Sequence, residues 1–211
     1  MSMSETVAEK ADFEMADSEM IDITFSLGGR SLPQAHAYEL WRAVARALPW
    51  LEAEYSAGIL PLRTSASGEG ELLPQRARLI LRVPIALASQ AQALSGQVLD
   101  VAGHELTVGE GKQRQLQAHP TLHAHLVTGA REEQEFLVGV AAELRQLGVA
   151  CKWICGRRMA ITGEQPIEGY SLVLHELKPL DSLRVQYAGL GGERRYGCGI
   201  FVPYKDIPDL G

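Results

Sequence analysis

The sequence has no long hydrophobic run and little cysteine, and both absences restrict what the protein can be. No stretch of the 211 residues approaches the roughly 18–20 consecutive apolar residues of a membrane span, and no basic segment followed by an apolar one opens the chain. Cysteine is limited to Cys151, Cys155 and Cys198, an odd number without the paired spacing of a disulfide framework or a zinc site. We therefore expect a cytoplasmic globular protein that does not associate with membranes.

The two common phosphate-binding fingerprints are also missing, although residues 189–201 are rich in glycine. The dinucleotide fingerprint needs a third glycine where Arg194 stands, and the Walker pattern needs a lysine where Cys198 follows Gly197. Closely spaced glycines can still form an anion-binding concavity from successive N–H groups. The segment therefore favours a nucleic-acid backbone over a mononucleotide, with a tight solvated turn as the alternative.

Basic and aromatic side chains in and near this segment are candidate contacts to a nucleic acid. Two adjacent arginines offer planar donor forks that suit phosphate, and the tyrosine after them offers a face on which a base can stack. A second pair of arginines and a lysine surround Gly156. Each could equally be a solvated surface charge. The candidate RNA-binding residues are Gly189, Gly191, Gly192, Arg194, Arg195 and Tyr196, together with Lys152, Arg157 and Arg158.

Negative charge is concentrated at the N-terminus. Residues 1–22 hold seven carboxylates and one lysine, a net charge of −6 that equals the charge of the whole chain. The remaining residues therefore balance to zero, with local basic patches. This composition predicts that residues 1–20 are an acidic, disordered tail. We also expect the fold to persist when residues 1–22 are removed.

Hydrophobic periodicity predicts a strand–helix–strand–strand–helix–strand order that occurs twice. Ser31–Gln34 has the pattern of a capping box that opens the first helix, and 65–71 is expected to be a flexible loop. The predicted strands lie at 21–27, 58–63, 77–83, 98–108, 121–128, 149–154, 159–162, 170–174 and 198–203, and the helices at 31–49, 84–94, 132–147 and 181–188. The fold class is thus α+β, with two tandem ferredoxin-like (RRM-like) units at 21–113 and 119–211 and a connector within 109–120.

His36 is the sharpest candidate for catalysis. We place it in the second turn of the first helix, where the positive end of the helix dipole favours a neutral imidazole, the side chain best suited to proton transfer near neutral pH. The alternative is a packed histidine, because His36 shares a helical stripe with Leu40. Tyr38 is a weaker catalytic candidate on another helix face.

A metal or cofactor is not expected. His119, His123 and His125 lie close in sequence, but no cysteine or carboxylate stands near them to complete a metal site.

Two blocks of sequence resemble a known family. The run Gly189–Pro203, with the pattern Gly-Leu-Gly-Gly-x-Arg-Arg-x-Gly-Cys-Gly-Ile-Phe-x-Pro, is similar to the C-terminal signature of the CRISPR repeat-RNA processing endoribonucleases of the RAMP superfamily, and most similar to the MYXAN-type branch. The run Leu32–Leu40 resembles a second block of the same family, the one that carries the histidine of RNA cleavage. The position matching that histidine is His36.

The resemblance implies a metal-independent cut within CRISPR repeat RNA. The 2′-OH beside the scissile phosphate would attack in line, giving a 5′-OH and a 2′,3′-cyclic (or 3′-) phosphate, with His36 as base or acid. It also implies two ferredoxin-like units, no cofactor, and association with other CRISPR-associated subunits of a surveillance complex. Two alternatives stay open: a noncatalytic RNA-binding subunit of the superfamily, and a ferredoxin-like nucleotide-binding module.

Overall fold

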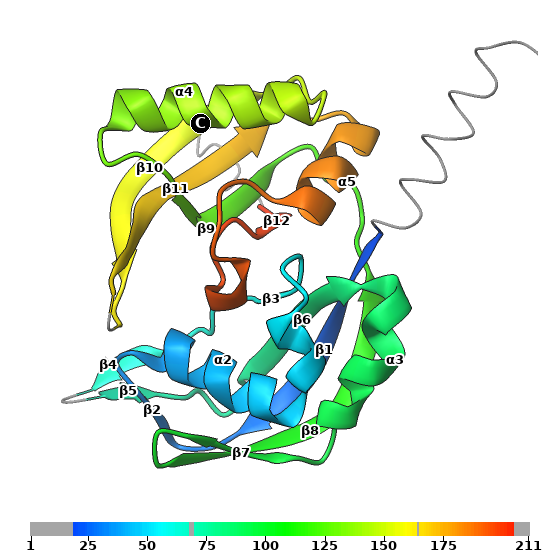
Figure 1. Cartoon of the computed structure of the whole chain (residues 1–211), viewed down its shortest axis with the longest axis vertical. Helices are drawn as coiled ribbons and strands as arrows, with labels where there is room; N and C mark the ends of the chain where they lie inside the picture. The colour runs from blue at the N-terminus through cyan, green and yellow to red at the C-terminus, as the bar shows by residue number, and fades with distance from the viewer. Residues whose placement is uncertain (1–18, 68–69, 164, 205–211) are drawn as a thin grey trace, which may run out of the picture.

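The computed structural model describes residues 19–67, 70–163 and 165–204, and in these ranges the chain folds into two units that stack on each other (Figure 1). Each unit has a twisted antiparallel sheet with helices packed against it. Among the described helices, none combines the length and the apolar character needed to cross a membrane.

The first unit has the predicted ferredoxin-like topology. Its sheet order is β3-β6-β1-β8-β7, in which β7 is an extra edge strand beside the four strands of the fold. On β1 the side chains of Ile21, Ile23, Phe25 and Leu27 are all buried while the intervening ones are not, which confirms the predicted alternation. The elements are β1 (Met20–Gly28), α2 (His36–Ala47), β3 (Gly58–Ile59), β6 (Arg78–Pro84), α3 (Ala88–Ala91), β7 (Val98–Val101) and β8 (His104–Gln115), with short 3-10 turns at Pro49–Glu52, Ile85–Leu87 and Gln92–Leu94.

The second unit repeats this topology with the sheet order β10-β11-β9-β12. The helix α4 buries Phe136, Val140 and Leu144, which is the stripe that a helical period predicts, and it covers the outer face of the sheet (Figure 1). The elements are β9 (Leu122–Thr128), α4 (Glu133–Gln146), β10 (Lys152–Ile161), β11 (Ile167–His175), α5 (Pro179–Ala188), the 3-10 turn η4 (Arg194–Tyr196) and β12 (Phe201–Pro203). The predicted fold class, α+β with two tandem ferredoxin-like units, is confirmed.

The predicted capping box and the predicted flexible loop are both wrong, for one reason. Ser31–Pro33 forms strand β2, which pairs with β5 (Gly70–Leu72), and β5 in turn pairs with β4 (Ser65–Ser67). Leu32 is fully buried in the core, and a Cβ at Gly70 would lie 2.8 Å from the Leu32 carbonyl oxygen. Burial of Leu32 and close backbone approach at Gly70 therefore stabilise a small three-stranded sheet, and α2 begins only at His36, without a side-chain cap.

Several predicted boundaries also move. Strand β8 continues to Gln115, so the connector between the units is residues 116–121 rather than 109–120, and the first unit does not end at 113. Strand β1 begins at Met20, which is buried, so the predicted tail is too long at its C-terminal end. Residues 1–18 of that tail lie outside the described residues. Removal of 1–22 would take away the start of the central strand β1, including Asp22, so a deletion that tests the tail should stop before Met20.

A buried arginine joins the two units. Arg82 on β6 is fully buried; its Nε and Nη2 donate to the two carboxylate oxygens of Asp22 on β1 at 2.7 and 3.0 Å. Its Nη1 donates to the main-chain carbonyls of Phe201 and Gln186 in the second unit at 2.7 and 3.3 Å. One guanidinium thus neutralises a carboxylate in the first unit and satisfies two carbonyl groups in the second.

Replacing Arg82 by Met should lower the free energy of unfolding by about 3–5 kcal/mol, because the Asp22 carboxylate and two carbonyl groups lose their partner while they stay largely buried. Urea unfolding followed by circular dichroism measures this change. As a matched control, Arg158→Met breaks an exposed pair with Glu168 and should cost less than about 1 kcal/mol. Equal losses in the two variants would contradict the role given to Arg82.

Candidate active site

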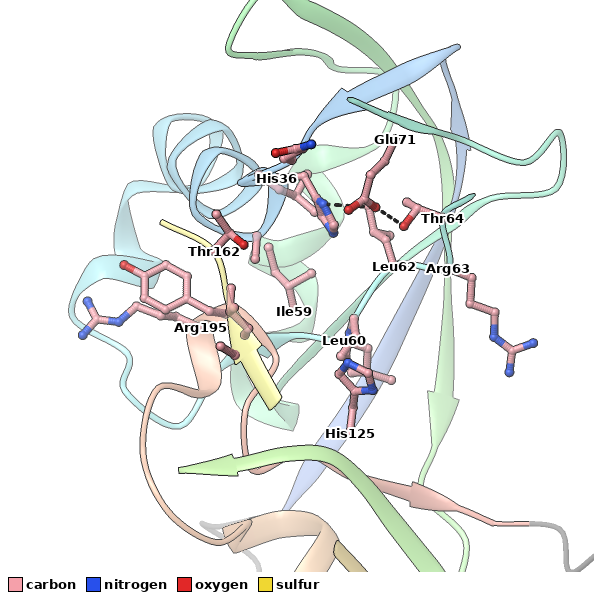
Figure 2. A pocket seen from close by; sticks show the side chains of 17 residues that line it. His36, Ile59, Leu60, Leu62, Arg63, Thr64, Glu71, His125, Thr162 and Arg195 are labelled. Carbon is pink, nitrogen blue, oxygen red and sulfur yellow. Dashed lines mark hydrogen bonds and ion pairs between the residues drawn. The ribbon is translucent and has the colours of Figure 1, made fainter. Parts of the chain in front are cut away.

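A cavity of about 460 Å³ lies where the two units meet. The first unit contributes the start of α2, residues 59–64 and Glu71 of β5. The second contributes His125 of β9, Ala160 and Ile161 at the end of β10, Thr162 directly after it, and η4 (Figure 2). Because both units contribute side chains, the cavity exists only when the units are held together.

His36 lies in the first turn of α2, at its first residue, and not in the second turn as predicted. Its side chain is 18% exposed and lines the cavity. The ring nitrogen Nδ1 is buried and has no hydrogen-bond partner within the described part of the chain; the Oε2 atom of Glu71 lies 3.5 Å from it. The position at the positive end of the helix is retained, and the imidazole lines the cavity.

Glu71 and Thr64 lie beside His36, and neither was among the candidates selected from the sequence. The hydroxyl of Thr64 donates to the same Glu71 Oε2 atom that faces His36 (Figure 2). Both residues fall in or beside the segment that was predicted to be a flexible loop. The pairing of Leu32 with Glu71 across β2 and β5 places the carboxylate, and periodicity does not reveal such a contact between distant segments.

Tyr38 is not brought to the same place as His36. It does not line the 460 Å³ cavity. Its hydroxyl donates to the carbonyl of Gln165 at 2.5 Å, and its ring stacks on Tyr196 with the ring centroids 4.3 Å apart. Partial burial raises the pKa of the Tyr38 hydroxyl. Tyr38 therefore links α2 to the β10–β11 turn and to η4, and its side chain lies away from the cavity that His36 lines, in keeping with its expected place on another helix face.

The glycine-rich segment uses its N–H groups inside the protein. Gly189 ends α5 with a φ of 72° and donates to the Val185 carbonyl. The N–H of Gly191 donates to the carboxylate of Glu143 at 2.7 Å, and the N–H of Gly192 donates to the hydroxyl of Thr128 at 2.7 Å. The groups that were predicted to hold a phosphate thus donate to protein acceptors, and the loop fixes the position of η4.

The two adjacent arginines of this segment have opposite environments. Arg194 is buried, and its Nη1 donates to the Ala188 carbonyl at 2.7 Å; burial, together with the nearby Arg82, lowers the pKa of Arg194 to about 10. The side chain of Arg195 is 45% exposed and lies 5.3 Å from the centre of the Tyr196 ring. Arg195 and Tyr196 line the cavity, whereas Arg194 does not.

The three basic candidates on β10 are exposed on an edge strand of the second sheet. Lys152 pairs with Glu176, and Arg158 pairs with Glu168. Arg157 lies in the bulge where the register with β11 shifts, and no ion pair of Arg157 occurs in the ranges that the structure describes. The same strand continues to the cavity through Ala160 and Ile161.

A second cleft, of about 730 Å³, adjoins the cavity and shares Arg63 and His125 with it. Arg114, His119 and His123 also line this cleft. Burial lowers the pKa of both His123 and His125, so both imidazoles are neutral near pH 7. Within the described ranges no three His, Cys, Asp or Glu side chains gather as metal ligands would. Arg63 was missed in the sequence because it stands alone in a loop.

Comparison with known proteins places the chain in a family. The family model described as "Cas6 Crispr" matches residues 21–206. The CRISPR-associated endonuclease Cas6 of Myxococcus xanthus (strain DK1622) is 36% identical over 187 residues, which cover 87% of this chain and 81% of that protein.

Solved structures share the fold at low sequence identity. A structure of the CRISPR-associated protein Cas6 has a TM-score of 0.63 at 14% identity and covers 89% of this chain and 100% of its own. A Cas6-related protein from Pyrococcus furiosus has a TM-score of 0.64 at 10% identity, with 89% and 99% covered. The Thermus thermophilus Cse3 structure, bound to an RNA representing a pre-cleavage complex, has a TM-score of 0.51 at 15% identity, with 87% and 98% covered. With a family model that spans nearly the whole chain and a relative of this identity, the chain belongs to the Cas6 family.

Proposed function

We propose that this protein is an endoribonuclease that cleaves CRISPR repeat RNA within precursor transcripts, with His36 as its proton-transfer residue. The observation that carries the proposal is the position of His36: it opens α2, lines a cavity built from both units and faces a carboxylate. The Myxococcus relative is named a CRISPR-associated endonuclease, and the Cse3 neighbour was solved with RNA. A cytoplasmic location belongs to this proposal, because the transcripts are made there.

The proposed reaction needs only groups of the RNA and of this chain. The 2′-OH of the nucleotide before the cut loses its proton and attacks the adjacent phosphorus, forming the 2′-O–P bond. The P–O5′ bond breaks, and the departing oxygen takes up a proton to give the 5′-OH end. The other product is a 2′,3′-cyclic phosphate. His36 transfers one of these protons, and the Arg195 guanidinium on the same cavity stabilises charge on the phosphoryl oxygens.

The proposed RNA path follows the exposed basic side chains at and near the cavity. Arg195 donates from Nε to the carboxylate of Glu193 at 3.3 Å, and both side chains are exposed, so phosphate can replace this pair at little cost. Arg195 and Tyr196 lie at the cavity, and β10 leads from the cavity to the exposed Arg157. Lys152 and Arg158 are also exposed and hold only surface ion pairs, which phosphate can replace at little cost. Arg194 and the glycines Gly189, Gly191 and Gly192 act indirectly, by fixing η4. Other subunits of a CRISPR surveillance complex are proposed partners.

Replacing His36 by Ala should lower the single-turnover rate of cleavage about 10²–10⁴-fold, the usual contribution of a positioned acid or base. Affinity for the repeat should change little, because a neutral imidazole contributes modestly to phosphate binding. The rate is measured with excess protein over labelled repeat RNA, in the presence of EDTA. His175→Ala, a partly exposed histidine at the end of β11, is the matched control and should cleave at the wild-type rate.

Cleavage by His36→Ala at the wild-type rate would contradict the assignment. Binding of the true repeat by wild-type protein without any cleavage would favour the noncatalytic RNA-binding subunit. The nucleotide-binding module has less support, because the glycine N–H groups that it would need are used within the protein.

Replacing Arg195 by Ala should weaken RNA binding and flatten its salt dependence, since each lost phosphate contact on a single strand reduces the slope of log K against log salt by about 0.7. Arg145→Ala, an exposed arginine near the end of α4 that lines neither the cavity nor the adjoining cleft, is the control and should leave the slope unchanged. Arg194→Ala should instead lower the midpoint of urea unfolding. An unchanged salt slope in Arg195→Ala would remove this residue from the RNA path.

A further inference from the structure

We infer that Glu71, anchored by Thr64, is a positioning residue that fixes the tautomer and orientation of His36, so that the Nε2 atom of His36 is the proton acceptor in the cavity. This inference rests on the proposed function and assigns the direction of its first proton transfer. Figure 2 shows the three side chains in line, with dashed contacts from His36 to Glu71 and from Glu71 to Thr64.

The burial of the His36 Nδ1 atom indicates which ring nitrogen carries the proton. A buried nitrogen without a partner is costly, and Nδ1 has no hydrogen bond within the described residues. The Glu71 Oε2 atom lies 3.5 Å from it, slightly beyond hydrogen-bond length, as is common for catalytic pairs before substrate binds. A lone pair on Nδ1 would face this negative charge, whereas an N–H would donate to it. The neutral ring therefore carries its proton on Nδ1.

The three-stranded sheet of β2, β5 and β4 determines where the Glu71 side chain lies. Strand β5 pairs Glu71 with Leu32 of β2, and directly opposite residues of an antiparallel pair project to the same side. Leu32 is fully buried, so the Glu71 side chain is directed to the inner side, toward the start of α2. The Thr64 hydroxyl donates to Oε2 and restricts the remaining rotation of the carboxylate. A carboxylate that projects from a paired strand and accepts this hydrogen bond is suited to orienting a ring.

The chemical consequence concerns Nε2. With the proton on Nδ1 directed at Glu71, the lone pair is on Nε2, and that nitrogen can take the proton of the 2′-OH. After the transfer both ring nitrogens carry hydrogen, and the Glu71 carboxylate stabilises the resulting imidazolium without itself accepting the proton. Glu71 acts through His36 and does not contact the reacting atoms in this scheme.

Nitrogen-15 NMR of the histidine side chains tests the inference in the intact protein. At about pH 8.5, where an ordinary imidazole is neutral, protonated and unprotonated ring nitrogens differ strongly in chemical shift. We expect His36 in the wild-type protein to be mainly the Nδ1–H tautomer. In Glu71→Leu it should move toward the Nε2–H tautomer that free histidine prefers. A wild-type His36 that is mainly Nε2–H would overturn the inference, even if the variant failed to fold.

Single-turnover cleavage gives the functional readout. Glu71→Leu should lower the rate about 10–100-fold, the range found when an outer partner that orients a histidine is removed, while RNA affinity stays within about twofold. Glu71→Gln should retain more activity, because its amide oxygen can still accept the Nδ1 proton. Glu39→Gln is the control: Glu39 is on the same helix but pairs with Arg42 and does not line the cavity, so the rate should be unchanged.

The two proposals fail in different ways. If a folded Glu71→Leu variant cuts at the wild-type rate, Glu71 has no positioning role. If His36→Ala is slow in the same assay, the proposed function still holds. Wild-type rates in both variants would remove His36 from the mechanism and the role of Glu71 with it.

Discussion

The contact on which the rest of the structure depends is the buried guanidinium of Arg82. Each ferredoxin-like unit has its own hydrophobic core, so neither core by itself determines where the other unit lies. Arg82 holds Asp22 of its own unit and two carbonyl groups of the other, and a charge at this depth is stable only with all of these partners. The cavity at His36 takes side chains from both units, and its shape therefore depends on this junction.

The position of the glycine-rich segment of the second unit also depends on close contact between the two units. Gly58 of β3 lies so close to the backbone of Arg194 that a Cβ there would be 2.3 Å from the Arg194 carbonyl oxygen. Gly199 has a φ of 65°, and its N–H donates to the Leu126 carbonyl at 2.7 Å. The glycines thus allow η4 to press against the first unit, which places Arg195 and Tyr196 on the cavity.

Periodicity predicted the fold, while the surroundings of the catalytic candidate could not be read from the sequence. The alternating strand β1 and the apolar stripe of α4 are local patterns, and both were correct. The capping-box pattern at Ser31–Gln34 was misleading, because pairing of Leu32 with Glu71 outweighs a local cap. Arg194 and Arg195 are identical in type and adjacent, yet one is buried and one exposed. Such differences arise from contacts between distant segments. His36 was selected from imidazole chemistry and its place at a helix N-terminus, and the family motif favoured it over the packed-histidine alternative.

In the proposed mechanism, a protein side chain at the junction of the units promotes attack by a hydroxyl that the RNA itself supplies. The most direct measurement uses a repeat RNA with deoxyribose at the single nucleotide before the cut and compares its binding and its cleavage with those of the unmodified RNA. We expect unchanged binding and no cleavage at that position, because the nucleophile is missing. Cleavage of the deoxy-substituted RNA at the normal position would contradict it.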